Sequence, residues 1–501
     1  MCFFSQCRFT LWPFLALNLA ALLLLLVACF LFYVRKTHVH WRRRGVPFLG
    51  PTQDIVLSRR NKSLTIQERY RRLAPHPYGG VWLGGKPYLI VRDPQVVQTV
   101  LIKAFSNFTD RGLIMAEDID PLSANLFNLS GDRWRNIRMK LVDSFSAVKL
   151  KSSFRLLEEC TNVLDRLSII ISNFVIGACA FGFNCNTIRD AESEFRRVGL
   201  KFAPNWVKMA LREAVAVINP RFVSWLNWRN IHPDLEHFFT RVTEETVRAR
   251  NQSPLKRKDF MQLLINAQQE ERIMLQEQDP KDQEPLFTDQ ILASHVFVFF
   301  VAGFESSSIT LSFCLYELAL NPKIMDKLHD EIRQVLDARE GKLDYDTFKE
   351  MPYLECVINE TLRKYPTVGW LDRICRKTFE EPNSSLIIDE NTNVIIPVYA
   401  LHHDPQYFPN PQKFDPERFN AENKSSIVPG TYLPFGAGPR ICVGVRFAML
   451  EMKAALTVII GKYTVHPTDR TPIPVKFHHR SFFNTSDRGL HLRFKERPKV
   501  A

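Results

Sequence analysis

The chain begins with an apolar segment that is long enough to cross a membrane. Residues 11–34 are almost uninterruptedly apolar, with Asn18 as the exception. A helix of this length spans roughly 36 Å at about 1.5 Å per residue, which is enough for a bilayer core. Arg8 precedes it, whereas five cations lie within residues 35–44, so residues 1–34 are predicted to be a membrane anchor with the following chain in the cytosol. A cleaved signal peptide is the alternative, although no small-residue cleavage site follows.

Two further segments follow the anchor. Residues 35–51 are rich in arginine and contain Pro47 and Pro51, which predicts a stiff linker because proline fixes the backbone angle φ. Residues 52–501 then carry the hydrophobic spacing of helices for most of their length, with a few short runs typical of strands. The pattern therefore predicts mostly helices with a few strands in this part of the chain.

Proline, glycine and capping residues mark the ends of the predicted elements. Residues 81–91 contain two apolar runs around Gly84-Gly85, which predicts a β-hairpin. Thr288 precedes a long apolar run over 289–320 that Asn321-Pro322 ends, which predicts a long helix. The same signals predict three shorter features: a helix over 353–364, two strands within 386–397, and a hairpin formed by 477–483 and 490–494.

The long apolar helix has an acid and a hydroxyl at its centre. Glu305 and Ser306 follow Gly303 there, and burying two polar side chains costs free energy unless they are paired or used. Gly303 weakens the helix locally and leaves room for a small ligand or a water molecule. The segment therefore indicates either a proton-transfer pair or a satisfied polar pair at a helix kink.

The strongest chemical signal is a glycine-rich loop around one cysteine. Residues 435–444 are Phe-Gly-Ala-Gly-Pro-Arg-Ile-Cys-Val-Gly, and an apolar helical run follows. Backbone N–H groups and a helix N-terminus at such a junction favour the thiolate form of Cys442, and a thiolate is a strong ligand for heme iron. Gly438 and Gly444 would let the backbone approach a flat ligand, and Arg440 would hold a carboxylate. The alternative is a free buried cysteine beside a chance glycine cluster.

The spacing Phe-x-x-Gly-x-Arg-x-Cys-x-Gly resembles the heme-binding loop of the cytochrome P450 family, and the resemblance extends over residues 42–494. It implies the cytochrome P450 fold, which is mainly α with a small β region, as one catalytic domain over residues 52–501. It also implies a heme b cofactor whose iron takes Cys442 as its axial ligand, with Phe435 shielding the sulfur. Residues 120–123 and 179–182 are most similar to insect microsomal members, the group associated with xenobiotic metabolism.

The resemblance also implies roles for residues outside the cysteine loop. The family places a Trp-x-x-x-Arg pair at the heme propionates, and Trp134 and Arg138 match it on one helix face. Its oxygen-activation motif has an acid followed by Thr, where this chain has Glu305 followed by Ser306. Serine keeps the hydroxyl but loses the methyl that fixes the rotamer, so proton delivery is expected to be leakier. The further propionate contacts expected are Arg111, Arg373 and Arg440.

A structural triad is expected behind the cysteine loop. Glu360 and Arg363 are three residues apart on one helix face, and Arg418 in a Pro-x-Arg-Phe segment matches the third member of a buried ion triad. One region departs from the family, because residues 151–182 are shorter than in similar proteins. A helix is therefore expected to be shortened or absent there.

Charge and cysteine usage narrow the partners and the compartment. The formal net charge is +13, yet no zinc-finger spacing or RNP-like aromatic stripe indicates nucleic-acid binding. A basic surface suits an anionic membrane or an acidic redox partner. The ten cysteines are scattered singly, so a reducing cytosolic setting is expected and a disulfide framework is not.

Together with the resemblance, these features predict an NADPH- and O2-dependent monooxygenase of the endoplasmic reticulum membrane. It would insert one oxygen atom into a hydrophobic small molecule, either a xenobiotic or an endogenous lipid-like compound. Electrons are expected from NADPH–cytochrome P450 reductase, docked near Arg133, Arg135 and Lys140, with cytochrome b5 as a further candidate partner. Two alternatives stay open: a heme-thiolate isomerase or dehydratase, and a degenerate non-catalytic relative, which the short region 151–182 would favour.

Overall fold

The computed structural model describes most of the large domain. The described residues are 39–51, 60–83, 86–112, 117–142, 219–253, 259–276, 285–382 and 384–498, with scattered positions within 18–35 and 194–216. The predicted anchor at 1–34 falls mostly outside them, and the short region at 151–182 falls wholly outside them. The structure therefore leaves both of those predictions untested.

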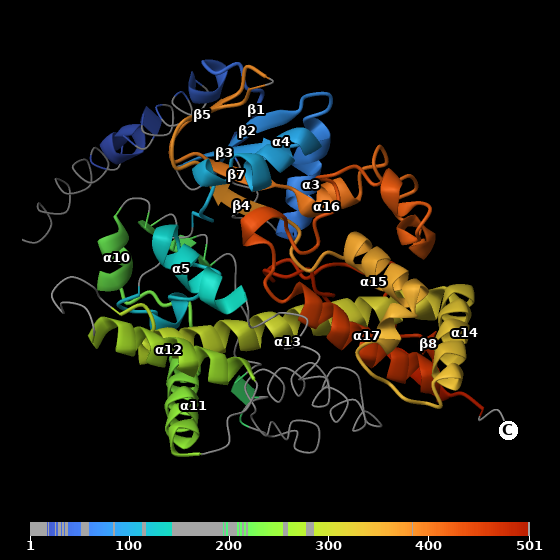
Figure 1. Ribbon diagram of the computed structural model, residues 1–501. Coiled ribbons are helices and arrows are strands. Elements are labelled where there is room, and N and C mark those ends of the chain that lie inside the picture. Colours follow the sequence, from blue (N-terminus) through green and yellow to red (C-terminus); the bar gives the residue numbers. More distant parts are fainter. Residues whose placement is uncertain are drawn as a thin grey trace, which may run out of the picture.

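The described fold is mainly helical, and one long helix organises it. Helix α13 (Asp289–Leu320) crosses the middle of the molecule, and helices lie along it on both sides (Figure 1). Thr288 caps this helix, because its side chain accepts a hydrogen bond from the Ile291 N–H, and Asn321 follows its end as predicted. The other helices are α3 (Lys62–Arg72), α4 (Pro94–Gln98), α5 (Gly131–Val142), α10 (Pro220–Trp225), α11 (Pro233–Gln252), α12 (Phe260–Gln276), α14 (Pro322–Ala338), α15 (Pro352–Lys364), α16 (Val398–His402) and α17 (Val445–Lys462).

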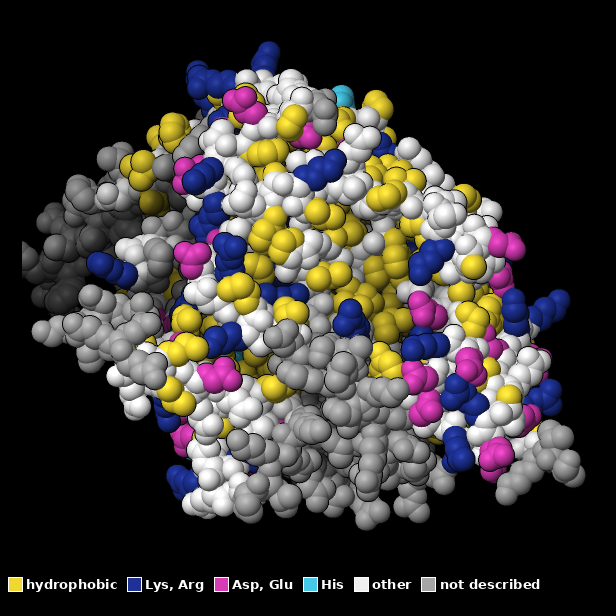
Figure 2. Space-filling model, in the orientation of Figure 1, with side chains coloured by type: hydrophobic (Ala, Val, Ile, Leu, Met, Phe, Trp, Pro, Cys, Tyr) yellow, Lys and Arg dark blue, Asp and Glu magenta, His cyan; other side chains and the backbone are white. Residues whose placement is uncertain are grey.

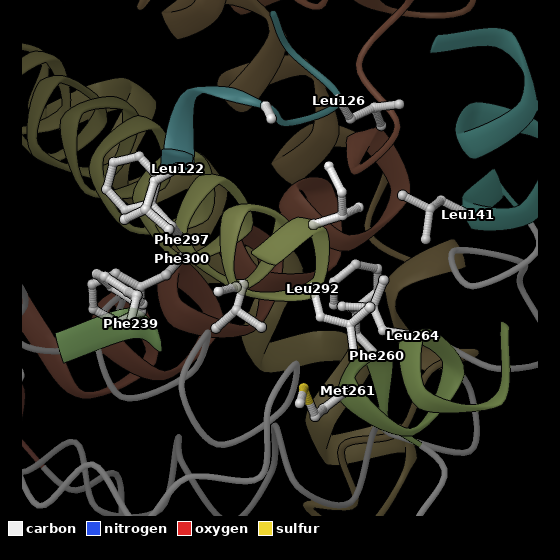
Figure 3. Close-up of a cluster of buried hydrophobic side chains, with 14 of the residues drawn as sticks. Leu122, Leu126, Leu141, Phe239, Phe260, Met261, Leu264, Leu292, Phe297 and Phe300 are labelled. Carbon is white, nitrogen blue, oxygen red and sulfur yellow. The ribbon is translucent and has the colours of Figure 1, made fainter. Parts of the chain in front are cut away.

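Helix α13 is largely apolar around its circumference because other helices pack against it on more than one side. On one side Phe297 and Phe300 contact Phe239 of α11, with ring centroids 5.3 and 5.4 Å apart (Figure 3). On the other side Leu311 and Leu315 join a buried cluster with α14, α15 and α17. Among the described helices, α13 alone has the length and hydropathy to span a bilayer, but half of that span is buried within the protein. Its packing makes it the core helix of the domain.

The small β region contains one five-stranded sheet with the order β1-β2-β3-β7-β4, and two two-stranded sheets, β5-β6 and β8-β9. The predicted hairpin is present as β2 and β3, which pair antiparallel. The strands are β1 (Phe48–Pro51), β2 (Tyr78–Leu83), β3 (Lys86–Val91), β4 (Leu371–Ile374), β5 (Phe379–Glu380), β6 (Ile387–Ile388), β7 (Asn393–Ile396), β8 (Tyr463–Pro467) and β9 (Leu492–Glu496).

One bridge at the sheet edge matters for the site. Strand β4 is the last strand of the large sheet, and Ile374 at its end bridges to Asp110 in a loop far earlier in the chain. The Ile374 N–H donates a hydrogen bond of 2.8 Å to the Asp110 carbonyl. This bridge brings the loop that carries Arg111 beside the strand that carries Arg373.

The predicted C-terminal hairpin is wrong. Residues 490–494 do not pair with 477–483, because β9 pairs instead with β8, the strand directly after α17. In that pairing Phe494 lies opposite Val465, which is fully buried in the cluster beneath α14 and α17. Burial against the helices therefore outweighs the local turn signal, and a single bridge from Phe477 to Ser486 is what the structure shows within the predicted hairpin.

Candidate active site

A cavity of about 1260 Å³ lies where α13, the cysteine loop and β4 meet. It is larger than the roughly 300–1000 Å³ of common small-molecule sites, so it has room for a prosthetic group together with a second ligand. Helix α13 contributes Ala302 and Ser306 to its wall. Every residue predicted to contact the cofactor lines it: Arg111, Trp134, Arg138, Arg373, Phe435, Arg440 and Cys442.

The side chain of Cys442 lines this cavity. Its own N–H donates to the Phe435 carbonyl at 2.9 Å, which closes the loop, and its side chain is exposed to the cavity. Burial raises the pKa of the thiol, while the Gly444 N–H and the charges of Arg138 and Arg111 lower it. The sequence predicted only the influences that favour the thiolate, and burial outweighs them. Metal coordination deprotonates a thiol outright, so this pKa does not oppose an iron ligand.

Gly438, one of the two glycines predicted to admit a flat ligand, has a different task. Gly438 has φ +71°, and a Cβ there would lie 1.9 Å from the Leu101 carbonyl oxygen. It therefore makes room for the protein chain and not for a ligand. Gly436, with φ +77°, is the loop glycine between Phe435 and Arg440 that lines the cavity.

Four guanidinium groups meet at the cavity wall, and they have few acidic partners. They belong to Arg111, Arg138, Arg373 and Arg440. Among the described residues, Arg440 is the one of the four with an ion pair, to Asp110 at 3.3 Å. Asp110 also holds Arg376 outside this group at 2.6 Å, so its charge is shared. The wall therefore carries a net positive charge.

Burial and mutual repulsion weaken the hold of these groups on their protons. Burial, followed by the charges of Arg440, Arg373 and Arg138, places the pKa of Arg111 well below its usual value. Burial lowers the pKa of Arg440 to about 9 and that of Arg373 to about 10. Anionic groups in the cavity would reverse these shifts.

Two donors on this wall have no partner in the described part of the chain. They are Nη1 of Arg440 and Nε of Arg373, both buried. Buried donors are normally hydrogen-bonded, so unmatched ones beside an uncompensated positive charge indicate a missing anionic acceptor. The propionate carboxylates of a heme fit that requirement, and the thiol of Cys442 fits its iron.

The predicted Trp-x-x-x-Arg pair lies on the same wall. The Arg440 guanidinium lies over the Trp134 ring, with its carbon 4.1 Å from the ring centroid, which fixes the ring against the loop. Arg138 donates a hydrogen bond of 2.8 Å to the Ile441 carbonyl, next to the cysteine. Helix α5 is thereby held to the cysteine loop by both residues of the pair.

The predicted ion triad is present behind the loop. Arg363 donates to both carboxylate oxygens of Glu360, at 2.7 and 2.8 Å, and Arg418 lies 3.5 Å from the same carboxylate. Glu360 and Arg363 are fully buried. Arg363 also donates to the carbonyls of His402 and Pro411, both at 2.9 Å, so the triad ties α15 to the segment before the cysteine loop.

His402 extends this link to the cysteine loop itself, and sequence reasoning missed it. Burial and the charge of Arg363 lower its pKa to about 3, so the ring is neutral. One ring nitrogen contacts the Arg363 carbonyl at 3.0 Å, and the other accepts from the Leu433 N–H at 2.8 Å. A lone histidine in a short helix carries no sequence signal for such a bridge.

Asp110, the partner of Arg440, was missed because its contacts are all distant in sequence.

The two residues of the predicted proton-transfer pair are placed differently. Ser306 lines the cavity, and its Oγ donates to the Ala302 carbonyl at 2.6 Å. Glu305 is not part of the cavity wall, and its carboxyl accepts no hydrogen bond from the described residues. Burial raises the pKa of Glu305 to about 7. The structure therefore brings one of the two to the cavity.

A helical domain with a small sheet, in which a cysteine and an arginine-rich wall face one cavity, is the arrangement expected of a heme-thiolate protein. The sequence model of the family "Cytochrome P450" matches residues 44–493. The chain therefore belongs to the cytochrome P450 family, which confirms the family, the fold and the heme-thiolate oxidoreductase class that the sequence predicted.

Curated relatives from insects are similar over nearly their whole length. "Probable cytochrome P450 6a13" of Drosophila melanogaster is 36% identical, with 96% of this chain and 100% of the relative covered. "Cytochrome P450 6k1" of Blattella germanica is 35% identical over 95% of this chain and 96% of its own. "Cytochrome P450 6a2" of Drosophila melanogaster is 36% identical over 94% and 98%. The predicted similarity to insect members is thus confirmed.

The triad generates a stability prediction. Glu360→Gln removes the charge that neutralises Arg363, which is fully buried, so we expect the free energy of unfolding to fall by about 3–5 kcal/mol. Urea unfolding followed by circular dichroism measures the change. Lys342→Ala, taken from the exposed pair of Lys342 and Glu340, is the control and should cost less than about 1 kcal/mol. Equal losses in the two variants would contradict the role of the triad.

Proposed function

We propose that the chain is an NADPH- and O2-dependent monooxygenase that inserts one oxygen atom into a hydrophobic small molecule. The observation that carries the proposal is the convergence of Cys442 and four arginines on a cavity whose wall includes the centre of α13. The similarity of the chain to insect cytochromes P450 supports the same reaction class.

In this proposal the wall residues bind and orient the cofactor. The Cys442 sulfur would hold the iron of the heme, and Phe435, which lines the same cavity, would shield that sulfur from water. The donors on the wall, which come from Arg111, Trp134, Arg138, Arg373 and Arg440, would hold the propionates. When bound, heme supplies the reductive activation of dioxygen that no amino-acid side chain provides.

Glu305 and Ser306 are proposed to handle protons on the α13 side. An acid with a pKa of about 7 both takes up and releases a proton near neutral pH, which suits Glu305 to general acid–base work. Ser306 would pass protons from its Oγ into the cavity. Because serine lacks the methyl group that fixes a threonine rotamer, we expect some loss of electrons to hydrogen peroxide.

The substrate would occupy the apolar part of the same cavity. Phe297 and Val301 of α13, Leu371 of β4, and Phe482 with Phe483 line it. This lining favours an apolar small molecule, such as the xenobiotics associated with insect members of the family or an endogenous lipid-like compound. Phe482 and Phe483 are the contacts to this part of the cavity from the end of the chain.

We further propose that residues 1–34 anchor the protein in the endoplasmic reticulum membrane, with the domain in the cytosol and electrons from NADPH–cytochrome P450 reductase or cytochrome b5. Figure 2 shows one face of the domain, on which Lys and Arg side chains are interspersed among apolar ones. Arg133 is engaged with Glu117 at 2.8 and 2.9 Å, so Arg135 and Lys140 of α5, both exposed, are the better candidates for docking an acidic partner.

The first test is the carbon monoxide difference spectrum of the reduced protein in microsomes. We expect the strongly red-shifted band of a thiolate-ligated heme, and its loss in Cys442→Ala, because the thiolate is the electron-donating ligand. Product formation should then require both NADPH and the reductase. Turnover without NADPH would favour the isomerase or dehydratase alternative, and the absence of any heme band would favour a non-catalytic relative.

The positive wall predicts how the cofactor is recognised. Heme whose two propionates are esterified lacks the anions that the arginines need, so we expect it to bind at least about tenfold more weakly than heme. Absorbance titration of the heme-free protein measures both affinities. Arg373→Ala should narrow the difference between the two ligands, whereas Arg339→Ala at the end of α14 should leave it unchanged. Equal affinity of the wild type for heme and its ester would rule out propionate recognition.

Docking through α5 is tested by charge reversal. In Arg135→Glu and Lys140→Glu the attraction to an acidic partner turns into repulsion, so half-maximal turnover should need more reductase, most strongly at low salt. Steady-state kinetics at increasing reductase concentrations measure this. The carbon monoxide spectrum should stay unchanged, which shows that the heme site is intact. Unaltered kinetics in both variants would exclude this docking face.

A further inference from the structure

Asp110, the acidic partner of Arg440, binds an exposed arginine more closely than it binds this buried one. One of its carboxylate oxygens, Oδ2, accepts a hydrogen bond of 2.6 Å from Arg376, whose side chain is 43% exposed. The other oxygen, Oδ1, lies 3.3 Å from Nη2 of Arg440, whose side chain has no exposed surface. Hydrogen bonds between a cation and a carboxylate are usually about 2.7–2.9 Å long. The carboxylate therefore holds Arg376 tightly and Arg440 loosely.

This preference is the opposite of what burial alone favours. A buried guanidinium needs a counter-charge more than an exposed one does, because water does not reach it. The contacts of Asp110 instead place the carboxylate closer to Arg376 and leave the charge of Arg440 only partly compensated. Such an arrangement costs free energy, and a second anion beside Arg440 would recover that cost. A propionate of the heme would be such an anion.

Other bonds hold Arg440 so that one of its nitrogens is left for a ligand. Its Nε donates to the Thr109 carbonyl, and its Nη2 donates to the Leu129 carbonyl at 2.8 Å as well as to Asp110. Oδ1 of Asp110 is itself fixed, because it accepts a hydrogen bond of 3.1 Å from the Gly131 N–H at the start of α5. The remaining nitrogen of Arg440, Nη1, is buried without a partner among the residues that the structure describes, and Arg440 lines the cavity. Nη1 is thus the donor that Arg440 has available for a carboxylate.

We propose that Asp110 is a positioning residue that sets how strongly the positive cavity wall attracts the propionates of the heme. It acts through Arg440, because the part of its charge that Arg376 takes does not neutralise Arg440. The half-exposed Arg376 is thereby linked to the cofactor site. The inference rests on the heme site of the proposed function and does not depend on its oxygen chemistry.

Two substitutions change the charge at the wall in opposite directions. Asp110→Asn keeps a hydrogen-bond acceptor for Arg440 and for the Gly131 N–H but removes the negative charge, so the wall becomes more positive. Arg376→Gln removes the outer cation, so the full charge of Asp110 acts on Arg440 and the wall becomes less positive. If the contacts of Asp110 were merely structural, both variants would instead weaken the site.

The first experiment measures cofactor recognition without turnover. Absorbance titration of the heme-free protein gives the affinity for heme and for heme with esterified propionates, and the ratio of the two reports propionate recognition. We expect this ratio to rise several-fold in Asp110→Asn and to fall several-fold in Arg376→Gln. Arg241→Gln on α11 is the matched control, because Arg241 is 38% exposed and pairs with Glu194 at 2.9 Å but does not line the cavity. It should keep the wild-type ratio.

The second experiment measures the midpoint reduction potential of the bound heme by spectroelectrochemistry. Reduction adds one electron to the heme, so a more positive wall favours the reduced form. The potential should shift to more positive values in Asp110→Asn and to more negative values in Arg376→Gln, and stay unchanged in Arg241→Gln. The double variant of Asp110 and Arg376 should match Asp110→Asn, because Arg376 has then lost the charge through which it acts.

The outcomes separate this role from the proposed function. Shifts of the same sign in the two single variants, or wild-type ratios and potentials in both, would overturn the role of Asp110 while the heme site stands. Simple addition of the two effects in the double variant would overturn the link from Arg376 through Asp110. If the wild type takes up no heme, the proposed function and this role are both wrong. Should Asp110→Asn fail to fold, Arg376→Gln alone decides the question.

Discussion

The buried charge of Glu360 is the constraint on which the rest of the site depends. A carboxylate with no exposed surface is tolerated here because Arg363 and Arg418 lie beside it. Arg363 also donates to the carbonyls of His402, at the end of α16, and of Pro411. The neutral ring of His402 contacts the Arg363 carbonyl through one nitrogen and accepts a hydrogen bond from the Leu433 N–H through the other. It thereby links Arg363 to the segment just before the cysteine loop. The position of Cys442 is thus set by polar bonds that begin at a helix more than seventy residues earlier in the chain.

The cavity wall shows the opposite electrostatic arrangement. Behind the loop the charges are balanced within the protein, whereas on the wall Arg440 is the one of the four guanidiniums that forms an ion pair within the described part of the chain, with Asp110. Burying these guanidiniums and holding like charges together costs free energy, which is expressed in the lowered pKa values of Arg111 and Arg440. A fold that tolerates such repulsion is preorganised for an anionic ligand, because binding relieves strain that the protein already carries.

The parts of this structure that follow local rules could be predicted from the sequence. The ends of α13, the β2-β3 hairpin, and the pairing of Glu360 with Arg363 depend on caps, turns and helix spacing. The parts that failed depend on long-range packing. Strand β9 pairs with β8 because Phe494 lies there opposite the buried Val465. Gly438 is needed because the Leu101 carbonyl lies where a Cβ would be. Desolvation raises the pKa of the Cys442 thiol, where a lower value was expected.

The bridge between Asp110 and Ile374 also bears on how the protein is made. The walls of the cavity come from residues as far apart as Arg111 and Phe483, and contacts of such separation form late because long loops must close first. During synthesis the N-terminal part leaves the ribosome first, so Arg111 and Trp134 are made before the residues that they contact in the finished cavity. The cofactor site is therefore completed only near the end of translation. Until then the arginines of the wall lack the later segments of the chain that hold them at the cavity.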